Sequence, residues 1–436
     1  MESGFPELEG LKDLAIEQLG TPCYESPFKG KDFRFVSDDS GVLVYSNTKD
    51  IERCKAGCIQ PPAFQEAGPR KKIYFNSKDV VAGMLTAGGL CPGLNDVIRT
   101  IVMQLTYEYG VKKIYGFRYG YEGISSKRHD DPMILNPQVV GDIQHQGGTI
   151  LGTSRGDQDL DDMLETLQKF EVNVLFVIGG DGTFRGAHKL ANLARERNLD
   201  IAFIGVPKTI DNDIFCSEKT FGFSTAVEEA RSAIYGAHEE AEAAWNGIGL
   251  VKLMGRDSGF IAMHATLANS DVNFCLIPEV QFTLEGENGL LARLEKRLER
   301  RRHAVVVAAE GAGQNLIKDG EETMQDSSGN ILHKDIGLYL KHQILRHFKE
   351  KGIPVTLKYI DPSYMIRSCE ANAEDSSFCL LLGQNAVHAA MAGKTNMFVA
   401  YWNNHFTHVP LKTAVGRRKT VNPLGDYWQS VIAMTD

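Results

Sequence analysis

The sequence predicts an α/β protein with two parallel β-sheets, preceded by an irregular N-terminal extension. Short apolar runs rich in β-branched residues recur along the chain, end in Gly, Asp or Glu, and are separated by longer helical stretches. Strands that are apolar throughout are buried on both faces, which is typical of parallel sheets covered by helices. The expected strands are Val80–Thr86, Lys113–Phe117, Val174–Ile178, Ile201–Val206, Ile248–Leu253, Phe274–Ile277, Ala304–Ala309, Val355–Ile360 and Met397–Trp402.

The stretches between these runs are expected to be helical. In one of them, four leucines share a face while arginines and lysines take the opposite face, as in a surface helix: Leu290, Leu291, Leu294 and Leu298. A polar, turn-rich beginning and a break near residue 210 predict an extension (1–76), a first α/β domain (77–212) and a second α/β domain (213–395). The remaining segment (396–436) is expected to return to the first domain.

The overall charge of the chain bears on the kinds of ligand that the protein can bind. Formal net charge is −9, with 47 basic and 56 acidic residues, which argues against general binding to nucleic acid or to a membrane surface. A local basic pocket for a phosphorylated ligand remains compatible with that charge. No apolar stretch approaches the roughly 20 residues that span a bilayer, and the N-terminus lacks the apolar region of a secretory signal. We therefore expect a cytoplasmic protein.

Three glycine-rich turns follow expected strands or precede expected helices. They are Ala87–Asn95, Gly147–Gly156 with Arg155 among small residues, and Gly179–Thr183. Glycines let the backbone approach a ligand, and the N-terminus of a helix attracts anions. The first two turns are equally compatible with simple tight connections. In the third, Asp181 is either an ordinary helix cap or a carboxylate for Mg²⁺ beside phosphate, and the three glycines favour the second interpretation.

A fourth segment, Val206–Asp213, places Thr209, Asp211 and Asp213 directly after a buried strand. Transfer of a phosphoryl group to a hydroxyl needs a carboxylate that orients or deprotonates that hydroxyl. Because ligands gather beyond the carboxyl ends of strands in open α/β sheets, these aspartates are expected to share a crevice with the glycine turns. A solvated acidic turn is the alternative.

These four motifs, in this order, resemble the phosphofructokinase superfamily. The resemblance continues in Lys252–Gly259, Ala309–Gly311 and Lys358–Arg367, and covers roughly residues 75 to 430. The last motif is most similar to the long ATP-dependent branch of trypanosomatids and plants. The resemblance implies the phosphofructokinase fold, with a Rossmann-like domain for ATP and a second one for fructose 6-phosphate. It also implies ATP-dependent phosphorylation of fructose 6-phosphate to fructose 1,6-bisphosphate, the committed step of glycolysis.

Residue roles follow from the resemblance. Asp211 matches the catalytic base for the sugar 1-hydroxyl, Thr209 and Asp213 match positions beside the transferring group, and Arg256 matches a cation that stabilises it. Asp181 matches the Mg²⁺-binding carboxylate. Positions that match ATP contacts are Gly89, Arg155, Gly156, Gly180, Asp181, Gly182 and Thr183. Positions that match substrate contacts are Thr209, Ile210, Asp211, Met254, Gly255, Arg256, Glu310, Lys358, Tyr364, Met365, Ile366 and Arg367.

Two positions bear on the phosphoryl donor, which is ATP or pyrophosphate in this superfamily. Pyrophosphate users resemble Gly-Gly-Asp-Asp, in which the second aspartate occupies and repels the site of the ATP α-phosphate. Here that position is Gly182, which favours ATP, whereas Lys208 is typical of pyrophosphate users. The chain also departs from the bacterial members, which contribute an arginine to the neighbouring subunit's sugar site. Gly247 stands at that position, so the detail of an inter-subunit site is open.

Several alternatives stay open. Pyrophosphate dependence, a non-catalytic regulatory subunit, and an NAD or diacylglycerol kinase each account for part of the pattern, although the last two kinases share only residues 179–183. The resemblance also implies a homotetramer and AMP as an effector. The stretch Gly393-Lys394-Thr395 is expected to be a helix-ending turn rather than a phosphate loop. Arg417–Lys419 is a candidate for binding a phosphorylated effector.

Overall fold

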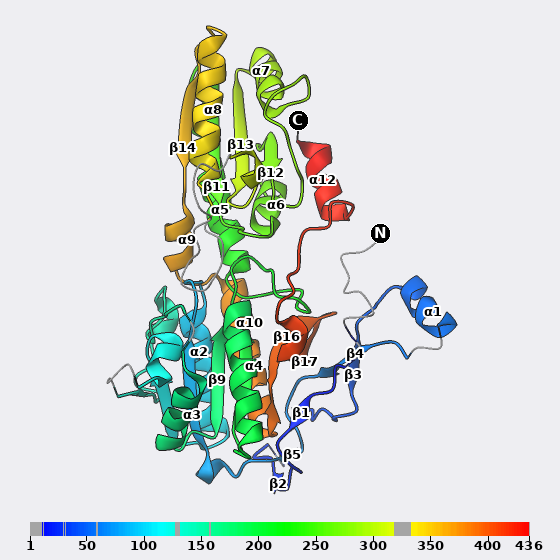
Figure 1. The fold of residues 1–436 in the computed structure, drawn as a ribbon, viewed down its shortest axis with the longest axis vertical. Coiled ribbons are helices and arrows are strands. Elements are labelled where there is room, and N and C mark those ends of the chain that lie inside the picture. Colours follow the sequence, from blue (N-terminus) through cyan, green and yellow to red (C-terminus); the bar gives the residue numbers. More distant parts are fainter. Residues whose placement is uncertain are drawn as a thin grey trace.

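Two β-sheets, each covered by helices on both faces, form the body of the molecule. The computed structural model describes residues 11, 13–28, 30, 32–57, 60–126, 131–156, 158–317 and 333–435. A nine-stranded sheet occupies the lower half of the view in Figure 1, and a four-stranded sheet occupies the upper half. Within the described residues, no helix is both long and apolar enough to cross a membrane.

The large sheet has a parallel centre with antiparallel edges. Its strands, in spatial order, are β3 (Gly41–Leu43), β4 (Ala63–Glu66), β17 (His405–Pro410), β16 (Met397–Trp402), β10 (Ala202–Pro207), β9 (Val174–Gly179), β6 (Val81–Thr86), β7 (Lys113–Phe117) and β8 (Met133–Ile134). The five strands from β16 to β7 run parallel to one another. The centre of the sheet is therefore the parallel α/β arrangement that the apolar runs predicted.

Alternate residues of the central strands pack into different cores. In β9, Val174, Phe176 and Ile178 belong to the core on one face, whereas Leu175 and Val177 belong to the core on the other face. Helices α2 (Leu94–Met103) and α10 (Ala373–Met391) cover the first face. Helices α3 (Leu160–Lys169) and α4 (Asp181–Glu196) cover the second face. Burial on both sides explains why these strands are apolar throughout.

The small sheet is parallel in all its pairings. Its order is β12 (Phe274–Leu276), β13 (His303–Ala309), β11 (Gly247–Leu253) and β14 (Thr356–Ile360). Helices α5 (Phe223–Glu242) and α6 (Phe260–Leu267) pack on one face. Helices α7 (Leu290–Arg301) and α8 (Ile336–Glu350) pack on the other. The leucine face expected in α7 is buried there, as its periodicity predicted. Short 3-10 helices lie at Ser77–Asp79, Gly120–Ile124, Ile143–His145 and Gln314–Leu316.

The C-terminal segment contacts both sheets. Strands β16 and β17 lie in the large sheet, and α11 (Leu411–Ala414) follows them. The chain then crosses to the small sheet, where α12 (Asp426–Met434) packs against α6 (Figure 1). The segment that we expected to return to the first sheet therefore does so through β16 and β17, whereas α12 lies beside the second sheet.

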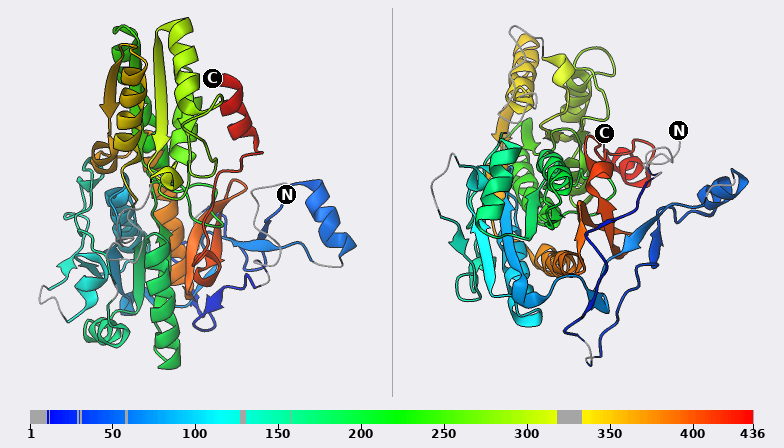
Figure 2. Two further views of the ribbon diagram at one scale, coloured as in Figure 1. Left: turned by 45° about the horizontal axis from the view of Figure 1, so that its top comes forward. Right: turned by 60° about the horizontal axis from the view of Figure 1, so that its bottom comes forward.

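The N-terminal extension is mostly irregular. Strands β3 and β4 lengthen the large sheet, and the two-residue strands β1 (Glu17–Gln18) and β2 (Tyr24–Glu25) pair with β15 (Lys394–Thr395) and β5 (Lys72–Ile73), respectively. Helix α1 (Thr48–Ala56) projects away from the body, as both views in Figure 2 show.

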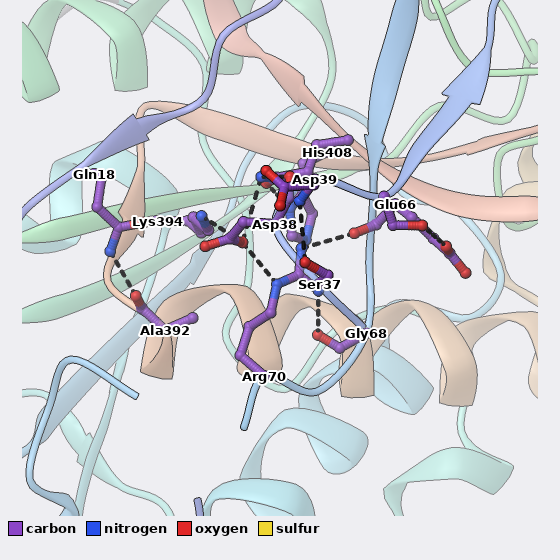
Figure 3. A network of polar contacts seen from close by, with 12 residues as sticks. Gln18, Ser37, Asp38, Asp39, Glu66, Gly68, Arg70, Ala392, Lys394 and His408 are labelled. Carbon is purple, nitrogen blue, oxygen red and sulfur yellow. Dashed lines mark hydrogen bonds and ion pairs between the residues drawn. The ribbon is translucent and has the colours of Figure 1, made fainter. Parts of the chain in front are cut away.

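A polar network fastens this extension to the end of α10 (Figure 3). The Asp38 carboxylate accepts hydrogen bonds from Arg70 Nε at 2.8 Å and lies 2.9 Å from Lys394 Nζ. Arg70 also donates to the backbone oxygens of Glu66 and Gly68. The Arg70 and Lys394 side chains are only 6% and 5% exposed. Lys394 is therefore half of an ion pair that holds the extension in place.

Gly393 lies in the turn that ends α10, as predicted, whereas Lys394 and Thr395 already form strand β15. Helix α10 ends at Met391, and Gly393 has a φ of 78°, the left-handed conformation that glycine adopts most readily after a helix. Its carbonyl oxygen accepts the Leu19 N–H at 2.9 Å.

We predict that Asp38→Ala destabilises the fold, because Arg70 and Lys394 then lose the carboxylate that they share. The free energy of unfolding in urea should fall by about 1–3 kcal/mol at pH 7, since Asp38 itself is half exposed to solvent. Burial alone would raise the pKa of Asp38, but hydrogen bonds from Lys394 and Arg70 lower it below its ordinary value. The stabilisation is therefore present at neutral pH and is lost as the pH falls through that lowered pKa.

The matched control is Lys113→Ala, which removes an ion pair with Glu171 in which both side chains are exposed. That variant should unfold at the same urea concentration as the wild type. Equal destabilisation of the two variants would contradict the role assigned to the buried network.

Candidate active site

A cavity of about 520 Å³ lies at the carboxyl ends of β6, β9 and β10. Loops that follow these three strands form most of its wall, Arg256 comes from the loop after β11, and Arg418 comes from the C-terminal segment. Among its described lining residues, six are basic and three are acidic: Arg155, Arg185, Lys189, Lys208, Arg256 and Arg418, with Asp181, Asp211 and Asp213. This balance suits a polyanionic ligand.

The glycine turn after β6 is held open by contacts with two other loops. The Gly88 N–H donates to the Ser154 oxygen at 3.2 Å, and the Thr153 hydroxyl donates to the Gly88 oxygen. Gly88 has a φ of 88°, and a Cβ at this position would lie 3.0 Å from Lys208 Nζ. The backbone conformation therefore favours glycine here, and a Cβ would also crowd the Lys208 ammonium.

Lys208 lies buried beneath this turn. Its Nζ donates to the Gly89 oxygen at 2.9 Å. Burial lowers the pKa of Lys208, and the neighbouring Arg155 and Arg367 lower it further. The Lys208 ammonium is therefore held by the Gly89 backbone oxygen at the wall of the cavity. There it adds positive charge without filling the cavity.

The N-terminus of α4 forms the second wall. Gly180 caps the helix, and Asp181 is its first residue. The Asp181 carboxylate accepts the Gly416 N–H on Oδ1 and the Arg185 guanidinium on Oδ2, each at 2.9 Å. Free N–H groups and the helix dipole favour phosphate at this end of a helix. A Cβ at Gly182 would meet nothing within 4 Å, so the cavity is open at this position.

The loop after β10 presents Asp211 to the cavity. The Asp211 N–H donates to Thr209 Oγ1 at 3.3 Å, and the Thr209 hydroxyl donates to Asp213 Oδ1 at 2.7 Å. Asn212 adopts a left-handed φ of 55°, and its side chain is bonded to the Thr220 N–H and the Glu218 oxygen. Asn212 therefore sets the turn that separates the two aspartates.

Asp211 is a buried carboxyl group with an unusual environment. Its Oδ1 has no hydrogen-bond partner among the described residues. Burial raises the pKa of Asp211 to about 7, helped by the nearby charges of Asp213 and Glu310, whereas Arg367 and the Arg256 backbone N–H act in the opposite direction. A carboxyl group with this pKa exchanges a proton near neutral pH, as a general base must.

The structure brings the expected ATP half of the site together. All seven residues assigned to ATP line this single cavity, and so do Lys208, Thr209, Asp211 and Arg256. Glu310 and Arg367 lie near enough to influence the pKa of Asp211. Both stand at the edge of this group rather than in the cavity wall.

The other expected substrate residues do not converge on Asp211 in the same way. Lys358 forms an ion pair with Glu240 and is half exposed. On helix α9 (Ser363–Ser368), Tyr364 and Met365 are 82% and 77% exposed, whereas Ile366 is buried. Met254 and Ile210 are also buried, and Gly255 has a φ of 125° in the turn after β11. The roles of these residues in sugar binding stay predictions.

Comparisons with known proteins agree with this geometry. The family model described as Phosphofructokinase matches residues 81–390. A protein from Borreliella burgdorferi named ATP-dependent 6-phosphofructokinase is 53% identical, over 97% of this chain and 96% of its own length. The chain belongs to the phosphofructokinase family. This match extends far beyond residues 179–183, so the alternative of an NAD or diacylglycerol kinase is wrong.

A second relative and a solved structure support the resemblance to phosphofructokinases that was drawn from the sequence. A Trypanosoma cruzi protein named ATP-dependent 6-phosphofructokinase is 42% identical, over 97% of this chain and 88% of its own length. The crystal structure of a pyrophosphate-dependent phosphofructokinase from Marinobacter aquaeolei has a TM-score of 0.66 at 20% identity, and covers 81% of this chain and 92% of that one. The phosphofructokinase fold predicted from the sequence is confirmed.

Several lining residues of this phosphofructokinase were not predicted from the sequence to face the cavity, among them Arg185, Lys189, Tyr121 and Arg418. Arg185 and Lys189 lie four and eight positions after Asp181, so helical spacing could have placed them on the face of α4 that meets the cavity. Tyr121 supports the Gly179–Thr183 turn, since its hydroxyl donates to the Thr183 backbone oxygen at 2.6 Å. Arg418 had been considered only as part of an effector-binding run, and no local pattern connects it with this cavity.

We predict that Asp211→Asn stabilises the protein in a pH-dependent manner. In the wild type the folded state holds the Asp211 proton more tightly than the unfolded state, so stability falls as the pH rises from the ordinary value of 3.8 to about 7. Removal of the charge should therefore raise the free energy of unfolding by about 2–3 kcal/mol more at pH 8 than at pH 5. Urea unfolding at the two pH values measures this difference.

Asp213→Asn is the control, because Asp213 already has an arginine partner, Arg418, and a hydroxyl donor, Thr209. It should show no comparable gain at pH 8. A pH-independent effect of Asp211→Asn would show that the Asp211 carboxyl titrates near its ordinary pKa.

Proposed function

We propose that this protein is an ATP-dependent 6-phosphofructokinase. It transfers the terminal phosphoryl group of ATP to the 1-hydroxyl of fructose 6-phosphate and so produces fructose 1,6-bisphosphate in glycolysis. The observation that carries the proposal is the position of Asp211. This buried carboxyl group, with a pKa near 7, opens into the same basic cavity as the glycine turns and Asp181.

In this proposal Asp211 is the base. As the sugar oxygen forms its bond to the γ-phosphorus of ATP, the bond from that phosphorus to ADP breaks and Asp211 takes the proton of the hydroxyl. Thr209 fixes the Asp211 backbone through the hydrogen bond that it accepts. Arg256 lines the same cavity and stabilises the charge on the transferring group.

Asp181 is the candidate ligand for Mg²⁺. Mg²⁺ binds proteins through one or two carboxylates and takes its other ligands from phosphates and water, so a single carboxylate beside a phosphate cradle suits it. When bound, Mg²⁺ supplies charge that offsets the negative phosphate oxygens. Asp181 is held for this task at the helix terminus by Arg185 and by the Gly416 N–H.

The sugar half of the site is assigned to the loops around the small sheet. Glu310 and Arg367 lie close enough to Asp211 to influence its charge, which supports a sugar phosphate bound beside it. The exposed side chains Lys358, Tyr364 and Met365 point to a site completed by a neighbouring copy, as in a homotetramer. The large sheet then serves mainly ATP and the small sheet mainly fructose 6-phosphate.

A purified-protein assay tests the proposal. ATP with Mg²⁺ should support formation of fructose 1,6-bisphosphate, and pyrophosphate should support it poorly. The same assay with AMP tests the proposed effector, and sedimentation tests the tetramer. Efficient turnover with pyrophosphate alone would establish the main alternative, and sugar phosphate binding without turnover would establish a regulatory subunit.

We predict that Asp211→Ser removes the base without closing the ATP pocket. Turnover should fall by about 10²–10⁴-fold, the usual contribution of a general base, while calorimetry shows ATP binding close to that of the wild type. Turnover like that of the wild type in this variant would refute the assignment of the base.

We predict that Gly182→Asp weakens ATP binding through its charge. The position has open space around a Cβ and lies in a helical turn, so the fold should tolerate the side chain. ATP affinity should fall about 10-fold or more, since an unscreened like charge near a phosphate costs about 1–2 kcal/mol. Gly182→Asn is the matched control, because it adds similar volume without charge. Equal losses in both variants would show that space, rather than charge, decides the donor.

A further inference from the structure

The chain between α11 and α12 passes beside the candidate active-site cavity, which Arg418 helps to line. We call Val415–Val421 the C-terminal strap; in Figure 1 it lies along the red trace between β17 and α12. Its backbone is paired along its length. Arg418 forms a β-bridge with Ile214, the Lys419 N–H donates to the Asp213 oxygen at 2.9 Å, and the Val421 N–H donates to Glu279 Oε1 at 2.8 Å.

The strap contacts an aspartate at the end of each of three strands. The Gly416 N–H donates to Asp181 after β9. The Arg418 guanidinium lies 3.5 Å from Asp213 Oδ2 after β10 and donates a hydrogen bond to Asp257 after β11. Because β11 belongs to the small sheet, Arg418 connects the two halves of the site.

A short chain of contacts leads from Arg418 to the proposed base. Asp213 receives Arg418 on Oδ2 and the Thr209 hydroxyl on Oδ1. Thr209 in turn accepts the Asp211 N–H. The Asp213 side chain is only 12% exposed, so a guanidinium beside it offsets a charge that solvent screens weakly. A carboxylate held on both oxygens is also fixed in orientation.

We propose that Arg418 is a positioning residue of the phosphoryl-transfer site, which holds Asp213 so that the Thr209–Asp211 turn stays in place and the base keeps its working charge. This inference rests on the proposed function. Arg418 reaches Asp211 through Asp213, and that indirect route separates it from the catalytic residues.

The expected effect on the base has a definite sign. The charged groups that face Asp211 are Asp213, Glu310, Arg367 and Lys208, and the first two raise its pKa. Loss of Arg418 leaves the charge of Asp213 less compensated and removes a positive charge from the cavity. Both changes favour protonated Asp211, so the acid limb of the rate profile moves to higher pH.

Three variants test the role of Arg418. Arg418→Gln removes the charge, and Arg418→Lys retains it. Arg417→Gln is the control in the same strap, since Arg417 packs on the Phe215 ring and does not line the cavity. Each variant is measured for kcat, for KM with both substrates and for the pH dependence of kcat/KM, with thermal unfolding to verify that it folds.

Arg418→Gln should lower kcat about 10- to 100-fold, the range for a lost charged hydrogen bond, with a smaller change in KM for ATP. Its acid limb should lie at higher pH than that of the wild type. Arg418→Lys should restore the acid limb, and Arg417→Gln should match the wild type in both respects. An Arg418→Gln enzyme with unchanged kcat and acid limb, or an acid limb shifted equally in Arg418→Lys, would overturn the proposal.

A second measurement is independent of turnover. Hydrogen exchange of peptides that cover residues 415–421 should be slow in the wild type, where the Gly416 and Lys419 amides are bonded, and faster in Arg418→Gln than in Arg417→Gln. Unchanged exchange in Arg418→Gln would overturn the contact on which the inference depends. A wild-type protein that phosphorylates no fructose 6-phosphate would instead overturn the proposed function, and the exchange result would still decide whether Arg418 holds the strap.

Discussion

Parallel strands end at the same edge of a sheet, and this constraint places the three central loops of the candidate active site. Strands β6, β9 and β10 are neighbours in register, so the glycine turn after β6, Asp181 after β9 and Asp211 after β10 must lie side by side. Antiparallel neighbours would have sent alternate loops to opposite edges. The helices that return the chain cover both faces, and the N-terminus of α4 then points into the cavity. The topology therefore determines where the candidate site lies, because it brings three loops that are distant in sequence to the same edge of the sheet.

The cavity has to meet two conflicting electrostatic requirements. Six basic side chains suit a polyanionic nucleotide, yet the reaction also needs a carboxylate that accepts a proton. Asp211 suits this proposed role because burial and two acidic neighbours hold its pKa near 7, against the effect of Arg367. Had Asp211 been paired directly with a cation, its pKa would fall and it would be a poor base. The cations contact Asp181 and Asp213 instead, so the acidic cluster is neutralised around the base rather than at the base.

The sequence was sufficient for the local elements and for the gathering of the glycine turns, Asp181 and Asp211 around one cavity. Each of the nine expected strands agrees with an observed strand to within one residue at either end, because burial on both faces leaves an unambiguous apolar run. Contacts between residues that are distant in the sequence were harder to predict. Lys394 resembled part of a phosphate loop in a short motif, and only its pairing with Asp38, more than 350 residues away, explains its burial. Arg418 had no local signal, because its partners Asp213 and Asp257 depend on where the chain crosses between the sheets. The exposed α9 is a different case, since in the proposed homotetramer its contacts would come from a neighbouring copy of the chain.

The position of the C-terminal strap bears on how the two halves of the site act together. Asp211 is carried by the large sheet, whereas Arg256 and Asp257 follow β11 of the small sheet. In the proposed reaction a phosphoryl group moves between ligands held by different sheets, so a shift of one sheet against the other by as little as about 1 Å would separate the proposed base from the acceptor. The hydrophobic core is continuous across the boundary and resists such a shift, but apolar contacts are non-directional and do not fix the orientation of a carboxylate. Arg418 supplies a directional hydrogen bond to Asp257 beyond the small sheet and an ion pair at 3.5 Å to Asp213 beyond the large sheet. Alignment of the site thus depends on a polar contact at the edge of the apolar core, contributed by a part of the chain that neither sheet contains.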